Sequence, residues 1–149
     1  MENNTFAKHP TFYAVGLSYK KADAEMRGKF SLDEQAKTNL LHQAKAEGID
    51  SLIVTSTCNR TEIYGFAQHP FQLIKLLCEN SQGTVEDFQK VAFVCKNSEA
   101  INHMFRVGTG LDSQILGDFE IISQLKNAFV ISKELNLVNA FLERLVNAV

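Results

Sequence analysis

The order of four short apolar segments constrains the fold of this chain more than any other feature of its sequence. These segments favour β-structure and cover residues 12–18, 51–55, 61–67 and 91–95. A helical repeat of apolar residues over 31–48 separates the first two segments, and a second repeat over 70–78 separates the last two. Only a short polar stretch separates the middle two. The sequence therefore predicts the element order β-α-β-β-α-β.

This order is typical of the α+β class and of the ferredoxin-like, split β-α-β arrangement. In that arrangement four strands form an antiparallel sheet, and helices cover it. Apolar residues also recur at helical spacing in 98–108, 121–135 and 141–149, so we expect extra C-terminal helices. Serine favours the N-cap position, and we predict helix N-caps at Ser31 and Ser98.

The charge balance excludes a strongly cationic nucleic-acid binder, because 15 basic and 17 acidic residues leave a net charge of −2. Hydrophobic residues make up 45% of the chain and charged residues 21%, which indicates a globular fold rather than disorder. Residues 19–30 are polar and are predicted to form a loop. The basic residues of this loop fit either a solvated surface or a phosphate-contacting patch; they are Lys20, Lys21, Arg27 and Lys29.

The N-terminal segment MENNTFAKHP has no apolar stretch, and no apolar run approaches the length of a membrane span. We therefore expect a cytoplasmic protein that does not enter the membrane. The three cysteines are an odd number without a CxxC pair, which argues against a disulfide framework and a zinc site. Cys78 and Cys95 lie in apolar patterns and are predicted to be core residues.

The polar segment TSTCNRTE, residues 55–62, is the most informative part of the chain for chemistry. It joins two apolar strands, and loops on a rigid scaffold are common positions for catalytic residues. Cys58 lies two residues before Arg60, and a nearby cation favours the thiolate, which is the nucleophilic form. Arg60 also has the geometry to hold a substrate carboxylate. The alternative is a buried, inert cysteine at the end of a strand.

A second polar segment covers residues 103–118, HMFRVGTGLDSQILGD. His103 and Arg106 are three residues apart and share one face of a predicted helix. Ser113 and its polar neighbours offer further contacts. The alternative is a helix end followed by a turn, with one surface histidine. The glycines do not form a G-x-G-x-x-G or P-loop pattern, so we expect no dinucleotide site in this chain.

Three segments together resemble the N-terminal catalytic domain of the glutamyl-tRNA reductase family. STCNRTEIY, residues 56–64, is similar to the nucleophile loop of that family. Residues 103–118 resemble its motif H-L-F-R-V-A-x-G-L-D-S-x-x-L-G-E, and residues 15–30 resemble its opening G-L-N-H-x-x-A-P-V-E-x-R-E-K. The three segments occur in the family order, and their spacing fits the family over nearly the whole chain.

The resemblance implies that Cys58 attacks the ester of glutamyl-tRNA and forms a glutamyl thioester. NADPH would then reduce this thioester to glutamate-1-semialdehyde for tetrapyrrole biosynthesis. It also implies that Thr57 and Arg60 hold the glutamate, and that His103 and Ser113 line the same pocket, His103 as a catalytic residue. Glu120 stands where the family has a glutamine that contacts the substrate, and we carry no contact over to it.

The resemblance further implies that residues 1–138 form the catalytic domain and residues 139–149 begin a connecting helix. In the family this helix leads to an NADPH-binding domain and to a domain that makes the full-length enzyme a homodimer. We therefore expect a longer natural protein, of which this chain forms the thioester but does not reduce it. Two other functions stay open: a binding module for the aminoacylated tRNA end, and a regulatory module that acts through its thiol.

Overall fold

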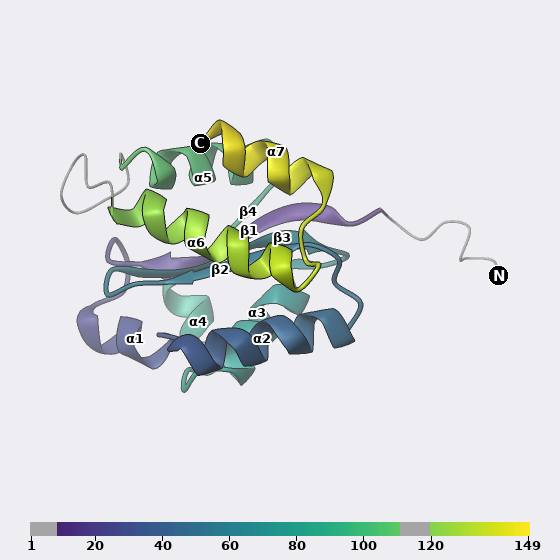
Figure 1. Ribbon diagram of the computed structural model, residues 1–149. Coiled ribbons are helices and arrows are strands. Elements are labelled where there is room, and N and C mark those ends of the chain that lie inside the picture. Colours follow the sequence, from purple (N-terminus) through teal and green to yellow (C-terminus); the bar gives the residue numbers. More distant parts are fainter. Residues whose placement is uncertain (1–8, 111–119) are drawn as a thin grey trace.

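The computed structural model describes residues 9–110 and 120–149, and these form a four-stranded sheet with helices on both faces (Figure 1). The elements in chain order are β1 (Thr11–Ser18), α1 (Ala24–Lys29), α2 (Glu34–Ala46), β2 (Leu52–Ser56), β3 (Arg60–Ala67), α3 (Pro70–Glu79), α4 (Val85–Val91), β4 (Phe93–Lys96), α5 (Ser98–Gly108), α6 (Glu120–Glu134) and α7 (Ala140–Ala148). Helices α1 to α4 lie below the sheet in Figure 1, and α5 to α7 lie above it.

The sheet has the strand order β2-β3-β1-β4, and each neighbouring pair is antiparallel. This order confirms the predicted α+β class and ferredoxin-like, split β-α-β sheet. The additional helices α5, α6 and α7 confirm the predicted C-terminal helices. Because directly paired residues share one face of a sheet, the register places Gly16 opposite Glu62 on the same face.

Two hydrophobic clusters lie on opposite faces of the sheet, and the strands supply them by alternation. On β1, Val15 and Leu17 belong to the cluster between the sheet and helices α2, α3 and α4. Phe12 and Ala14 belong to the cluster between the sheet and helices α5, α6 and α7. Because helices cover both faces, the strands are apolar at nearly every position. This explains why short continuous apolar runs, rather than strict polar alternation, marked them in the sequence.

Two short helices correct the sequence predictions. The loop predicted over residues 19–30 contains α1, which Asp23 caps by accepting a 2.9 Å hydrogen bond from the Met26 amide. Helix α4 was not predicted and includes Val91, so the fourth strand begins at Phe93 rather than at residue 91. Thr84 caps α4 through a 3.1 Å bond from the Asp87 amide. Each helix is under eight residues long, too short for a clear apolar periodicity.

The predicted caps at Ser31 and Ser98 are also wrong. Asp33 caps α2 by accepting a 2.8 Å bond from the Ala36 amide, while the Ser31 hydroxyl donates to the Gly28 carbonyl. Ser98 is the first residue of α5 and follows Asn97, whose side chain makes no capping bond.

The two cysteines predicted in the core are only partly buried. Cys78 packs against the cluster under α2 to α4, and Cys95 packs against the cluster on the other face. Both cysteines therefore pack against the core as predicted, but each lies at the border of its cluster rather than within it.

Gly16 gives a first prediction, because β1 and β3 approach each other closely at this position. A Cβ atom built there would lie 2.3 Å from the Thr61 carbonyl oxygen and 2.9 Å from the Glu62 Cα. Both are backbone atoms that cannot move aside cheaply, so we expect Gly16→Ala to lower the free energy of unfolding by about 2 kcal/mol or more. Urea denaturation measures this change.

Gly28 in α1 is the matched control, since a Cβ there meets nothing within 4 Å. Gly28→Ala is expected to leave the free energy of unfolding unchanged or to raise it by up to about 1 kcal/mol, because alanine has a higher helix propensity than glycine. Equal effects of the two substitutions would contradict the close approach at Gly16.

Candidate functional site

The turn between β2 and β3 carries Cys58 and is fixed by its own hydrogen bonds. The Thr57 amide donates to the Arg60 carbonyl at 2.8 Å, which closes the turn. The Thr57 hydroxyl accepts from the amides of Asn59 and Arg60 at 3.1 and 3.2 Å. The amide of Tyr19, at the end of β1, donates to the Asn59 carbonyl at 2.9 Å. The turn therefore has a defined conformation although it lies at the surface.

Arg27 of α1 reaches this turn from a distant part of the sequence. Its Nε donates to the Cys58 carbonyl at 3.0 Å, and its Nη1 donates to the Ala22 carbonyl at 2.7 Å. The guanidinium thus bridges the segment before α1 and the residue that carries the thiol. Cys58 itself is exposed, so the alternative in which this cysteine is buried at a strand end is wrong.

A second set of bonds joins the end of β2 to its surroundings. The Ser56 hydroxyl accepts from the Leu32 amide at 2.9 Å and shares a 2.9 Å bond with the Thr61 hydroxyl. These contacts join the segment before α2 to both strands that flank the turn. The thiol is therefore displayed on a support that three parts of the chain hold in place.

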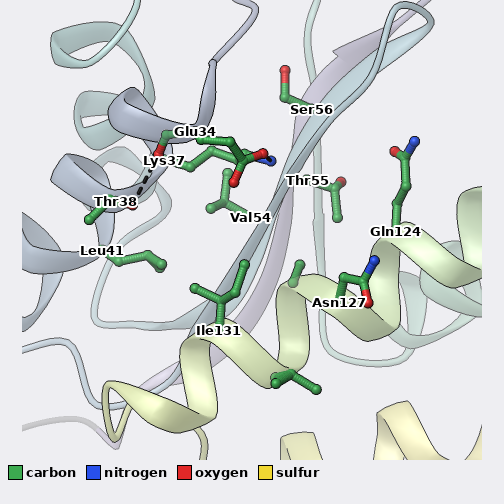
Figure 2. Close-up of a pocket in the computed structure, with 12 residues that line it drawn as sticks. Glu34, Lys37, Thr38, Leu41, Val54, Thr55, Ser56, Gln124, Asn127 and Ile131 are labelled. Atoms are coloured by element: carbon green, nitrogen blue, oxygen red, sulfur yellow. Dashed lines mark hydrogen bonds and ion pairs between the residues drawn. The ribbon is translucent and has the colours of Figure 1, made fainter.

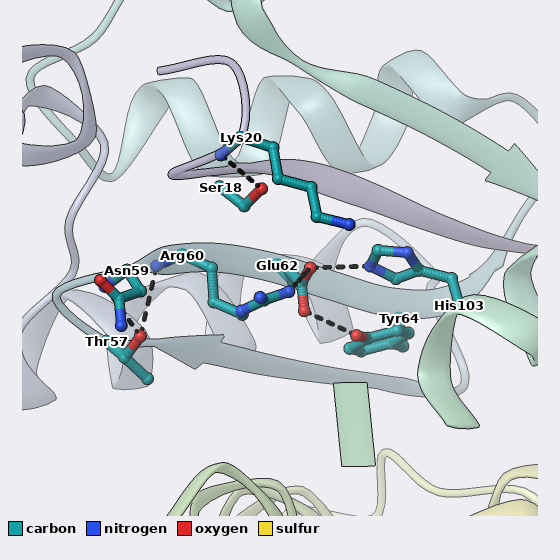
Figure 3. Close-up of polar contacts among 8 residues, drawn as sticks. All are labelled: Ser18, Lys20, Thr57, Asn59, Arg60, Glu62, Tyr64 and His103. Atoms are coloured by element: carbon teal, nitrogen blue, oxygen red, sulfur yellow. Dashed lines mark hydrogen bonds and ion pairs between the residues drawn. The ribbon is translucent and has the colours of Figure 1, made fainter. Parts of the chain in front are cut away.

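Below the turn, a row of polar residues runs along β3 into the sheet (Figure 3). Arg60, Glu62 and Tyr64 alternate along the strand and so point to one face. The fully buried Glu62 accepts from Arg60 Nη1 at 3.1 Å and from the Tyr64 hydroxyl at 2.6 Å. His103 of α5 approaches from the other side, with its Nε2 at 2.8 Å from Glu62 Oε2. Glu62 is the centre of this cluster.

The surroundings of Glu62 keep its carboxylate ionised. Burial alone would raise its pKa, but the hydrogen bond and charge of His103, the charge of Arg60 and the hydrogen bond from Tyr64 together lower the pKa below its usual value. An ionised carboxylate only accepts hydrogen bonds. His103 Nε2 must therefore carry the proton of the shared bond.

The imidazole of His103 is also oriented by ring contacts. Its centroid lies 4.4 Å from that of Phe93 and 6.2 Å from that of Tyr64. The side chain keeps 16% of its surface exposed, so the ring joins the buried cluster to the surface. The carboxylate and the two aromatic rings fix both the tautomer and the orientation of His103.

The structure thus brings together Thr57, Cys58 and Arg60 in and beside one turn, and it joins Arg60 to His103 through Glu62. Ser113 and the rest of 111–119 lie outside the described residues. Sequence reasoning missed Glu62, because the predicted strand began at residue 61 and left Arg60 in the loop, whereas β3 begins at Arg60 and places the two on one face. It also missed the contact of Arg27 with the turn, which no local pattern indicates.

Within 9–110 and 120–149, no three His, Cys, Asp or Glu side chains are grouped so that they would hold a metal ion. None of the described helices is long and apolar enough to cross a membrane.

The fold and site define an α+β domain in which a ferredoxin-like sheet presents an exposed thiol on a fixed turn above a buried ion-pair cluster. The family model described as "Glutamyl-tRNAGlu reductase, N-terminal domain" matches residues 15–149, and the chain belongs to this family.

Curated relatives named glutamyl-tRNA reductase agree with this assignment. The relative from Flavobacterium psychrophilum is 80% identical over 149 residues, which cover 100% of this chain and 36% of the relative. The relative from Acinetobacter baumannii (strain AYE) is 35% identical over 130 residues, covering 87% of this chain and 30% of its own length. This chain therefore spans about a third of the curated relatives that it matches.

A solved structure, the glutamyl-tRNA reductase from Methanopyrus kandleri, has a similar fold. The match has a TM-score of 0.75 at 25% sequence identity and covers 91% of this chain and 31% of the other. The similarity in structure thus extends over almost all of this chain.

Proposed function

We propose that this chain is the part of a glutamyl-tRNA reductase that transfers glutamate from glutamyl-tRNA to Cys58. The observation that carries the proposal is the exposed thiol on a turn that Thr57 and Arg27 hold in one conformation. An enzyme nucleophile needs both access to its substrate and a fixed position, and Cys58 has both. The whole protein would then act in tetrapyrrole biosynthesis.

In the proposed step, the Cys58 sulfur attacks the ester carbonyl carbon that joins glutamate to the terminal ribose of the tRNA. A carbon–sulfur bond forms and the carbon–oxygen ester bond breaks. The thiol proton ends on the departing ribose oxygen, so the products are a glutamyl thioester and deacylated tRNA. No oxidant or reductant is needed for this step.

The remaining site residues have roles that fit their surroundings. Arg60 supplies positive charge for the glutamate side chain, and Glu62 fixes where that charge lies. Thr57 shapes the turn that receives the substrate. We propose that His103, oriented by Glu62, exchanges protons with the reacting groups, and that Ser113 completes the pocket.

The cofactor of the proposed enzyme is NADPH, and the described residues do not fit it. A dinucleotide site of the Rossmann type uses a glycine-rich turn in a parallel β-α-β unit, whereas the pairs of this sheet are antiparallel. We therefore derive no step of this chain through NADPH. The reduction, the homodimer and the cytoplasmic location are parts of the proposal that concern the whole protein.

The test is acylation of the chain by an activated glutamyl ester, followed by its intact mass. We expect one glutamyl adduct that hydroxylamine removes, as a thioester requires, and a much weaker reaction with the aspartyl ester. Chain in which Cys58 has been alkylated beforehand is the control and should gain no adduct. A thiol that alkylates readily but accepts no glutamate would contradict the proposal and favour a binding or regulatory module.

A further inference from the structure

A cavity of about 490 Å³ lies between α2 and α6 at the open edge of β2 (Figure 2). Strand β2 pairs only with β3 among the described strands, so no strand covers its outer edge. Cavities of this size bind small molecules or single groups of larger ones. We call it the α2–α6 pocket. Of the candidate-site residues described above, Ser56 alone lines it.

The polar side of the pocket offers two amides and an unused hydroxyl. Gln124 and Asn127 of α6 line it, one turn of the helix apart. Thr55 of β2 faces the same pocket and has an exposed fraction of only 3%. Among the described residues, its Oγ1 has no hydrogen-bond partner. Because a buried polar group without a partner costs free energy, this hydroxyl points to a ligand that bonds to it.

The other side of the pocket is apolar and lies deeper along β2. Three apolar side chains line this side in Figure 2: Leu41 of α2, Val54 of β2 and Ile131 of α6. Ile131 has an exposed fraction of 38%, which is high for a large apolar side chain that lines a cavity. The pocket thus combines apolar walls for a flat group with amides for the edge of that group.

The place of the pocket relates it to Cys58. Ser56 lines its upper end and lies two residues before Cys58, so their Cα atoms are at most about 7 Å apart. At the same end, Lys37 and Glu34 form an ion pair of 2.8 Å on the rim. A molecule that fills the pocket therefore ends beside the turn that carries the thiol.

We infer that the α2–α6 pocket binds the terminal adenosine of the acylated tRNA, an inference that rests on the proposed function. The adenine base has a donor and acceptors on its edge, which asparagine and glutamine amides match, and its faces suit apolar walls. With the edge of the base at Gln124 and Asn127 and one face on the apolar side, the ribose and its ester lie toward the Ser56 end beside Cys58.

The test compares two glutamyl esters with equal leaving groups, one of adenosine and one of methyl ribofuranoside. We expect Cys58 to be acylated about tenfold more efficiently, in kcat/KM, by the adenosine ester. The double variant Gln124→Ala/Asn127→Ala should reduce this ratio to about one and leave the methyl ribofuranoside reaction unchanged. Gln89→Ala, which removes an exposed amide on α4, should keep the full ratio.

Equal efficiency of the two esters in the unaltered chain, or a ratio that survives the double variant, would overturn the inference. Acylation by neither ester would instead contradict the proposed function, and a titration then tests the pocket on its own. Adenosine 5′-monophosphate should shift the side-chain amide NMR signals of Gln124 and Asn127. No shift, or stronger binding of NADP⁺ at the same amides, would overturn the assignment to the tRNA end.

Discussion

Replacing Cys58 with serine is expected to lower acylation by a glutamyl ester on the order of 10³-fold or more, to the level of the uncatalysed background. The serine hydroxyl is similar in size to the thiol, but it does not ionise near neutral pH and is a weak nucleophile. Because Cys58 is exposed, the change removes no core contact, and the free energy of unfolding should stay the same within about 0.5 kcal/mol. Intact mass after timed exposure to the ester measures the loss.

The other two cysteines are the matched controls for this prediction. Burial and the charge of Glu79 raise the pKa of the Cys78 thiol. Burial, together with the charges of Glu99 and Glu62, raises that of the Cys95 thiol. Both thiols therefore stay neutral, and Cys78→Ser and Cys95→Ser should keep the adduct. A Cys58→Ser chain that still gains a glutamyl adduct would contradict the assignment of the nucleophile.

Glu62→Gln is expected to lower the free energy of unfolding by about 3–5 kcal/mol. The substitution keeps the shape of the side chain but removes the negative charge that lies 3.1 Å from Nη1 of the buried Arg60. It also replaces one carboxylate oxygen, an acceptor, by an NH₂ group, a donor. The hydrogen bonds of Glu62 with Arg60, Tyr64 and His103 then cannot all be kept. Urea denaturation at pH 7 measures the change.

The pH dependence of stability provides a second measure of Glu62. The folded chain holds its pKa below the ordinary value of 4.5, so the folded state binds this proton more weakly than the unfolded state. The stabilisation is therefore complete above pH 4.5 and is lost as the pH falls through the lowered pKa. Glu62→Gln should flatten this part of the stability curve on the acid side.

An exposed ion pair is the control for the effect of Glu62. Lys133 and Glu143 are 3.3 Å apart, with side chains 56% and 44% exposed. Exposed pairs contribute little, so Glu143→Gln should change the free energy of unfolding by less than about 1 kcal/mol. A similarly small effect of Glu62→Gln would show that the buried cluster does not support the sheet.

The sheet could be predicted because strands covered on both faces are apolar over most of their length, and the polar turn at residues 56–60 separated two of them clearly. The order of elements then left few possible topologies. The helices α1 and α4 could not be predicted in the same way. Each has one or two turns, and its position depends on a single capping side chain, Asp23 or Thr84.

In the candidate site, too, residues that are close in sequence could be predicted, whereas contacts between distant parts of the chain could not. Thr57, Cys58 and Arg60 are neighbours in sequence. The pattern of polar residues between two strands located Cys58 and Arg60, and the family resemblance added Thr57. The contact of His103 with Glu62 spans 41 residues, and that of Arg27 with Cys58 spans 31. Such contacts follow from how helices α1 and α5 pack on the sheet, which no local pattern encodes. The domain boundary at residues 138 and 139 stays a prediction.

The central claim is that Cys58 is a nucleophile selective for glutamate, and competition between two nearly identical esters tests it most directly. The chain is mixed with equal concentrations of the activated glutamyl and glutaminyl esters, which differ in the charge of the side chain. The adducts are then identified by peptide mass. The account predicts that the glutamyl adduct, on Cys58, predominates by about tenfold or more, since a buried guanidinium favours a carboxylate over an amide. Equal adducts, or adducts on other residues, would contradict it.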